Sequence, residues 1–196
     1  MTGDLFITGD PDADRLLNAD GGALLIGMLL DQQVPMEWAF MGPATLKGRL
    51  GHLDLSRIAS MDVETFVGVC CQKPAIHRFP ASLGRRIHAV CEVIRDTYDG
   101  RPERIWIEAD DADDLSARLR ALPGFGDEKT KILIALLAKR QGVRPDGWER
   151  AAGVFADGTP RSVADIHDEA SLAVVRNWKK AQKAAKRDKQ DRPLRN

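Results

Sequence analysis

Residues 115–137 read LSARLRALPGFGDEKTKILIALL and predict two helices joined by a glycine-rich turn. Before the turn, leucines recur at positions 115, 119 and 122, which is the spacing of one apolar helix face. After the turn, residues 132–137 are apolar on every side, so we expect a covered central helix there. Proline and glycine disfavour the interior of a helix, which places the break between the two helices at residues 123–126.

The same helical periodicity extends through most of the chain. Residues 83–94 carry apolar side chains at helix spacing, and residues 23–30 are apolar throughout. The strand-like triplet Ile105-Trp-Ile is too short to build a sheet. Pairs such as Gly42-Pro43 are expected to end one helix and begin another. We therefore predict an all-α fold with two helical lobes, a helix-hairpin-helix motif at about residues 115–140 and a cleft between the lobes.

Composition limits the class of protein. The 196 residues are 43% hydrophobic and balance 29 Lys and Arg against 29 Asp and Glu, which suits one folded domain. The longest apolar run, residues 23–30, is shorter than the roughly 20 residues that cross a bilayer. The start of the chain lacks a basic signal region, and the three cysteines have no metal-ligand spacing. We expect a soluble, cytoplasmic protein without a cofactor, a metal or a membrane partner; its oligomeric state stays open.

Charge is distributed unevenly along the chain. Residues 176–196 contain nine basic side chains and two acidic ones, a local charge of +7 on an otherwise acidic body. Asp168 or Ser171 is placed to cap a final helix that leads into this segment. We divide the chain into a helical domain, residues 1–175, and a basic helix or tail, residues 176–196. The tail is either a solvated helix end or a contributor of nonspecific DNA affinity.

The turn between the two central helices has the chemistry of an anion site. Gly124 and Gly126 leave the backbone bare, and the following helix points its free N–H groups and positive dipole end toward them. A phosphate would fit there, with Lys129 and Lys131 neutralising its charge. The alternative is a structural turn, which the acidic residues 127–128 favour because they would repel the same phosphate.

The sequence Leu-Pro-Gly-Phe-Gly at residues 122–126 of an all-helical chain resembles the hairpin of helix-hairpin-helix DNA glycosylases. In that family a short Gly/Pro loop and a catalytic aspartate follow the second helix. Here the loop is residues 142–145, and Asp146 lies 20 positions after Gly126. Residues 25–33 resemble the family's early buried helix and the polar loop that ends it. The similarity covers residues 24–153 and is strongest at the hairpin.

The resemblance implies a DNA-repair enzyme that acts on double-stranded DNA with a damaged or mismatched base. Gly124 and Gly126 would hold a backbone phosphate, while Gln33 would fill the space of the flipped nucleotide. Members that also cleave the strand carry a lysine at the position of Glu128, so the chain is expected to be a monofunctional glycosylase. No cysteine follows Asp146, so the iron–sulfur cluster of one branch is absent.

The resemblance assigns the chemistry to Asp146. A carboxylate can stabilise the positive charge that builds on the sugar and can direct a water, provided that solvent does not screen it. Asp146 can equally cap the helix that begins near Trp148, which is the tryptophan we favour for base stacking. Arg144 and Pro145 precede the aspartate where apolar residues would bury it. A catalytic Asp146 predicts that Asp146→Asn keeps duplex binding and loses base release.

Two other functions fit the same sequence. A noncatalytic DNA-binding protein could keep the hairpin and lack the chemistry, which the short chain and zero net charge allow. A helical protein-interaction domain could use the acidic body and basic tail without touching DNA. The sequence does not select the excised base among uracil, thymine, adenine and alkylated purines, nor does it exclude a monovalent cation at the hairpin carbonyls.

Overall fold

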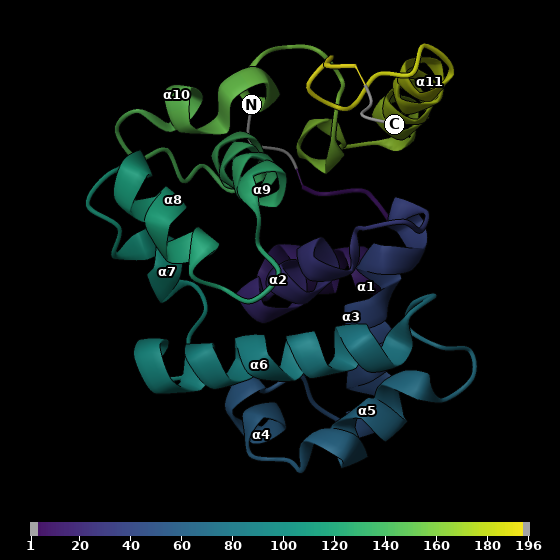
Figure 1. Ribbon diagram of the computed structural model, residues 1–196, viewed down its shortest axis with the longest axis vertical. Coiled ribbons are helices and arrows are strands. Elements are labelled where there is room, and N and C mark those ends of the chain that lie inside the picture. Colours follow the sequence, from purple (N-terminus) through teal and green to yellow (C-terminus); the bar gives the residue numbers. More distant parts are fainter. Residues whose placement is uncertain (1–3, 194–196) are drawn as a thin grey trace.

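The computed structural model describes residues 4–193, which form eleven α-helices and two 3-10 helices, η1 and η2 (Figure 1). Within these residues there is no strand, and the one isolated β-bridge joins Arg187 and Pro193. The all-α prediction is therefore confirmed. None of the helices in this part of the chain is long and apolar enough to cross a bilayer.

The helices are short or of medium length and are separated by tight turns. Their bounds are α1 Pro11–Ala19, α2 Gly21–Leu30, α3 Met36–Leu50, α4 Leu55–Ala59, α5 Val63–Cys71, α6 Pro80–Tyr98, α7 Arg104–Ile107, α8 Ala112–Arg120, α9 Asp127–Arg140, α10 Trp148–Ala152, η1 Gly153–Ala156, η2 Val163–Asp165 and α11 Glu169–Ala184.

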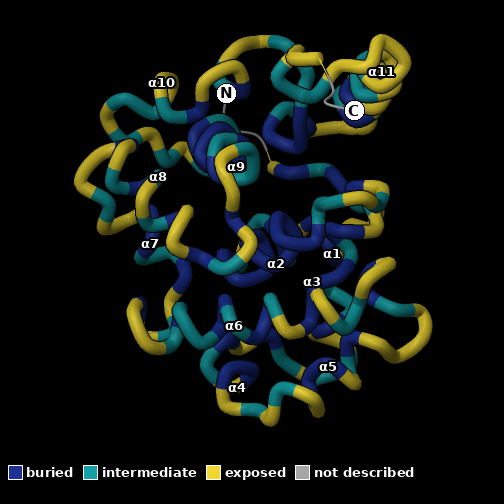
Figure 2. Tube along the Cα trace, viewed as in Figure 1, coloured by how far each residue is buried: buried dark blue, intermediate teal, exposed yellow. Residues whose placement is uncertain are grey.

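Two covered helices form the centre of the protein. All ten residues of α2 are buried, and α9 is buried continuously from Ile132 to Ala138 (Figure 2). Both are the segments whose sequence is apolar on every side, as expected for a helix with neighbours all around it. The predicted central positions of residues 23–30 and 132–137 are confirmed.

The remaining helices gather in two groups around this centre. Figure 1 shows α4, α5 and α6 at one end of the molecule and α8, α9, α10 and α11 at the other, with α2 between them. The apolar stripe of residues 83–94 lies on α6 and is buried against α4 and α5. Buried side chains from both groups belong to one continuous core. The core therefore fixes how the two groups sit relative to each other.

One expected break is wrong. Gly42 and Pro43 lie inside α3 instead of separating two helices. Gly42 faces α2 so closely that a Cβ there would stand 2.3 Å from Leu30 Cδ1. The close packing of α3 on α2 outweighs the low helix propensity of the pair. The Ile105-Trp-Ile triplet belongs to α7, a single helical turn.

The capped start of the last helix is confirmed. The Asp168 carboxylate accepts the N–H of Ser171 in a capping box at the start of α11. After α11, residues 187–193 form a compact turn, which we call the C-terminal turn. Its centre is Asp188, whose Oδ1 accepts the N–H groups of Gln190 and Arg192 at 2.8 and 2.9 Å. The basic tail is therefore folded through residue 193.

Candidate nucleic-acid interface

The turn between α8 and α9 is a tight, anchored hairpin. Leu122 and Phe125 are buried, and the Phe125 N–H donates to the Leu122 carbonyl oxygen at 3.1 Å. Gly124 adopts φ 87°, a left-handed conformation that favours glycine. Two apolar anchors thus hold an exposed backbone loop in one conformation, and Figure 1 shows this loop reaching down to α2.

The start of α9 offers a row of free donors. Gly126 caps the helix without a side-chain hydrogen bond, and the N–H groups of residues 126–129 have no acceptor within residues 4–193. Four such groups at a helix N-terminus, together with the positive end of the helix dipole, attract an anion. The hairpin therefore has the free donors that the predicted anion site requires.

The two glycines serve different purposes. A Cβ on Gly124 would lie 2.4 Å from Arg86 Cδ and 2.6 Å from Leu29 Cδ1, so this glycine is needed for packing. A Cβ on Gly126 would meet nothing within 4 Å. Packing therefore explains Gly124, whereas the open space at Gly126 is where a ligand can approach bare backbone.

Lys129 ties the hairpin to α2. Its Nζ donates to the carbonyl oxygen of Leu29, near the end of that helix. Burial lowers the pKa of Lys129 to about 8, and nearby Asp31 opposes this shift. The amine therefore points into the structure, and its contribution to a phosphate would act through its charge and not through direct contact.

Lys131 is engaged with the acidic start of α9. Its Nζ lies 2.8 Å from Asp127 Oδ2, and Arg120 also pairs with this carboxylate. The hydrogen bond with Lys131 holds the pKa of Asp127 below its usual range. Two cations thus surround Asp127, which removes much of the repulsion that a phosphate would meet at the hairpin.

Gln33 lies on the loop that leaves α2 and is exposed. Its backbone has φ 56°, an uncommon value for a residue other than glycine. The preceding carbonyl, that of Gln32, is 2.9 Å from His77 Nε2. Burial lowers the pKa of His77, and its Nδ1 accepts the N–H of Phe79 at 3.0 Å, so both ring nitrogens are engaged with backbone. Buried His77 therefore anchors the loop on which Gln33 is exposed to solvent.

Asp146 lies away from the hairpin. Its carbonyl oxygen accepts the N–H of Ala112 at 3.0 Å, at the start of α8, whereas the hairpin follows the end of α8. The nine residues of α8 span about 13 Å at 1.5 Å per residue. The Asp146 side chain is exposed, and Gly147 occupies the N-cap of α10. The structure thus brings Gln33 and the hairpin together but not Asp146, whose catalytic role stays a prediction without geometric support.

Three residues that the sequence did not single out stand at the same place. The side chain of Asp31 is only 10% exposed, and its Oδ2 lies 3.9 Å from Lys189 Nζ. The same amine is 3.7 Å from Glu128 Oε1, so the C-terminal turn reaches both loop and hairpin. Arg86 stands against Gly124 from α6. No sequence spacing connects these residues, because four separate segments supply this surface. We call residues 31–33 and 124–129 together the loop–hairpin face.

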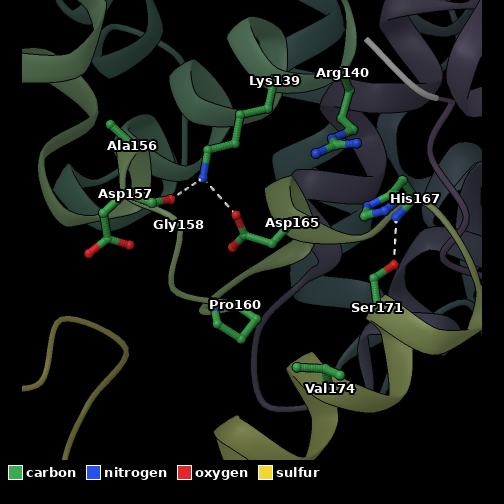
Figure 3. Close-up of a pocket in the computed structure, with 10 residues that line it drawn as sticks. All are labelled: Lys139, Arg140, Ala156, Asp157, Gly158, Pro160, Asp165, His167, Ser171 and Val174. Atoms are coloured by element: carbon green, nitrogen blue, oxygen red, sulfur yellow. Dashed lines mark hydrogen bonds and ion pairs between the residues drawn. The ribbon is translucent and has the colours of Figure 1, made fainter. Parts of the chain in front are cut away.

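A cavity at the C-terminal end of α9 is less suited to a ligand than the loop–hairpin face (Figure 3). Its buried charges already satisfy each other, since Lys139 Nζ lies 2.6 Å from Asp165 Oδ1 and donates to the Asp157 carbonyl at 2.8 Å. Arg140 donates to the backbone carbonyl of Ala164. These contacts tie the loop before η2 to α9, which is a structural role.

Comparison with protein-family models, with curated proteins and with solved structures gives no match. The resemblance to helix-hairpin-helix glycosylases therefore rests on the residues of this chain alone.

Proposed function

We propose that the protein binds duplex DNA and excises a damaged or mismatched base in the cytoplasm by hydrolysing its N-glycosidic bond. The observation that carries this proposal is the loop–hairpin face, where free helix N–H groups lie beside a loop that presents Gln33. An anion grip and a protruding polar side chain are the two parts needed to hold a strand and open its stack. Three unpaired cysteines suit the reducing compartment.

The phosphate grip would use main-chain donors at Gly126 and the first turn of α9. Arg86 packs its aliphatic stem against Gly124, and its positive charge acts on nearby Lys129, so it adds a cation beside the hairpin. Lys129 contributes its charge from beneath the surface. This arrangement places backbone donors nearest the anion and cations behind them, so it is suited to a phosphodiester of any sequence.

Of the carboxylates beside this grip, Asp31 is the best shielded from solvent, with a side chain 10% exposed against 48% for Asp127 and 39% for Glu128. We assign Asp31 the role of stabilising the cationic sugar while water adds to C1′ and the base leaves with a proton. Its shielding from solvent strengthens the electrostatic effect, whereas water screens the exposed Asp146. Lys189 now pairs loosely with Asp31, and a bound strand would compete for this lysine.

A noncatalytic DNA-binding protein is the second candidate. The feature that favours it is the ion pairing of Lys189 with two carboxylates of the loop–hairpin face, those of Asp31 and Glu128. If this lysine stays in place when DNA binds, Asp31 is neutralised and chemistry stops while phosphate binding continues. The two candidates therefore share the grip and differ only in what Asp31 does.

The test is base release from a panel of duplexes containing U:G, T:G, adenine opposite oxidised guanine, hypoxanthine and alkylated purines. Strands are analysed before and after alkali. Cleavage that requires alkali supports a monofunctional glycosylase and names its base. Cleavage without alkali contradicts this assignment and makes the low-pKa amine of Lys129 the candidate nucleophile.

Two matched variants locate the carboxylate. Asp31→Asn is expected to bind duplex and lose base release by at least a hundredfold, whereas Asp146→Asn is expected to retain it. If Asp146→Asn loses base release and Asp31→Asn retains it, Asp146 is the catalytic carboxylate. Duplex binding without any base release supports the noncatalytic candidate, and absence of duplex binding supports the helical protein-interaction domain.

A further inference from the structure

A cavity of about 530 Å³ lies beside the loop–hairpin face and is closed on its other side by the end of α11 and the C-terminal turn. Gln33 and Glu128 line it from the loop–hairpin face, while Trp178, Gln182 and Lys183 line it from α11. Its volume falls within the range of small-molecule sites, which hold roughly 300–1,000 Å³.

An indole forms one wall of this cavity. Trp178 is half-buried, and Arg161 Cζ lies 5.4 Å from its ring centroid. A guanidinium that covers one face of a ring holds the side chain in place. Trp178 is thus a fixed aromatic surface at a site that already contains Gln33, as base stacking requires.

Gln182 supplies an unfilled acceptor on the same helix. Its Oε1 is buried and has no hydrogen-bond partner within the described residues. A buried acceptor without a donor is destabilising, which makes a ligand N–H favourable there.

Cationic side chains complete the cavity. Lys179, Lys183, Arg187 and Lys189 all line it, against the acids Glu128 and Asp188. Lys189 pairs with Glu128 and Lys183 is exposed, so Lys183 remains available to an incoming anion. The cavity therefore combines an aromatic wall, a hydrogen-bond acceptor and positive charge.

We propose that this cavity is a nucleotide site, in which a base stacks on Trp178, donates an N–H to Gln182 Oε1 and places its phosphate near Lys183. The inference rests on the proposed function, because the nucleotide would come from the strand that the hairpin grips. It assigns the basic C-terminal segment a specific role: α11 and the C-terminal turn build the wall opposite the loop–hairpin face. Trp178, and not Trp148, becomes the stacking residue.

The experiment titrates the full chain with 2′-deoxyadenosine 5′-monophosphate and follows the tryptophan indole N–H signals by NMR. The parent is expected to bind with a millimolar Kd and to shift the Trp178 signal. Trp178→Ala and Gln182→Leu are each expected to weaken binding about fivefold or more. Trp148→Ala, which removes a half-buried indole on α10 that does not line this cavity, is the matched control and should bind as the parent does. If the larger substitutions disturb the fold, Lys183→Ala at an exposed helix position tests the site instead, and it is expected to weaken binding.

Control titrations show which part of the nucleotide is responsible for binding. Adenosine and inorganic phosphate are titrated alone, and the proposal requires both to bind more weakly than the nucleotide. Inorganic phosphate that binds equally well identifies an anion site only and overturns the proposal, as does a titration that leaves Trp178 unmoved. Duplex binding is measured separately. If the protein binds duplex through Gly126 but the nucleotide does not shift the Trp178 signal, the nucleotide site is refuted and the proposed function stands. If the nucleotide binds but duplex does not, the proposed function is refuted and the nucleotide site stands.

Discussion

Replacing Gly124 with alanine tests the structural reading of the hairpin. The new Cβ would stand 2.4 Å from Arg86 Cδ and 2.6 Å from Leu29 Cδ1, and φ would remain at 87°. A left-handed conformation costs a residue with a Cβ about 1–2 kcal/mol, and overpacking costs about 1–3 kcal/mol. We therefore expect Gly124→Ala to lower the free energy of unfolding by about 2–5 kcal/mol.

Gly126→Ala is the matched control, because its Cβ would meet no atom within 4 Å and its φ is −83°. Alanine is a poorer N-cap than glycine, so a loss of up to about 1 kcal/mol is expected. The assay is urea unfolding at pH 7 followed by far-ultraviolet circular dichroism. Equal losses for the two variants, or a Gly124→Ala protein as stable as the parent, would refute the assignment of packing to Gly124 alone.

Three further predictions concern charged groups. Because burial lowers the pKa of folded Lys129 to about 8 against about 10.4 when unfolded, the folded state releases its proton first, and stability rises with pH between these values. Between pH 8 and 10 the parent should therefore gain about 2 kcal/mol in free energy of unfolding relative to Lys129→Met. No such gain should appear relative to Lys131→Met, because that variant keeps Lys129. Lys139→Met leaves the buried carboxylate of Asp165 unpaired and should cost about 3–5 kcal/mol in urea unfolding; no loss would contradict a buried pair. Asp31→Asn should abolish base release in the alkali assay with unchanged duplex affinity, and retained release would remove Asp31 from the chemistry.

Much of the fold follows from local patterns that the sequence displays directly. The two fully apolar segments become the buried helices α2 and α9, and the stripe of residues 83–94 becomes the buried face of α6. Caps are equally local, as at Asp168. Gly42-Pro43 escaped prediction because the contact with Leu30 that keeps α3 continuous comes from another helix. Tertiary packing, which a pattern of one segment does not contain, decides such cases.

Only those features of the site that depend on residues adjacent in sequence could be predicted. The bare backbone at Gly126 and the exposure of Gln33 follow from the motif and its loop. The neighbourhood of Asp31, Arg86 and Lys189 depends on which segments the fold brings together, and each lies on a different segment. The distance of Asp146 from the hairpin has the same origin, since the length of α9 carries the chain away from it.

The loop–hairpin face is tested most directly by duplex binding of the parent and of Gly126→Ala, measured by fluorescence anisotropy at several salt concentrations. We expect the parent affinity to fall steeply as salt rises and Gly126→Ala to bind about tenfold more weakly, because a methyl group at an exposed N-cap keeps a phosphate from the free N–H groups. Circular dichroism of the same samples should show an unchanged fold. Equal affinity of the two proteins, or no duplex binding by the parent, would contradict a phosphate grip at the hairpin.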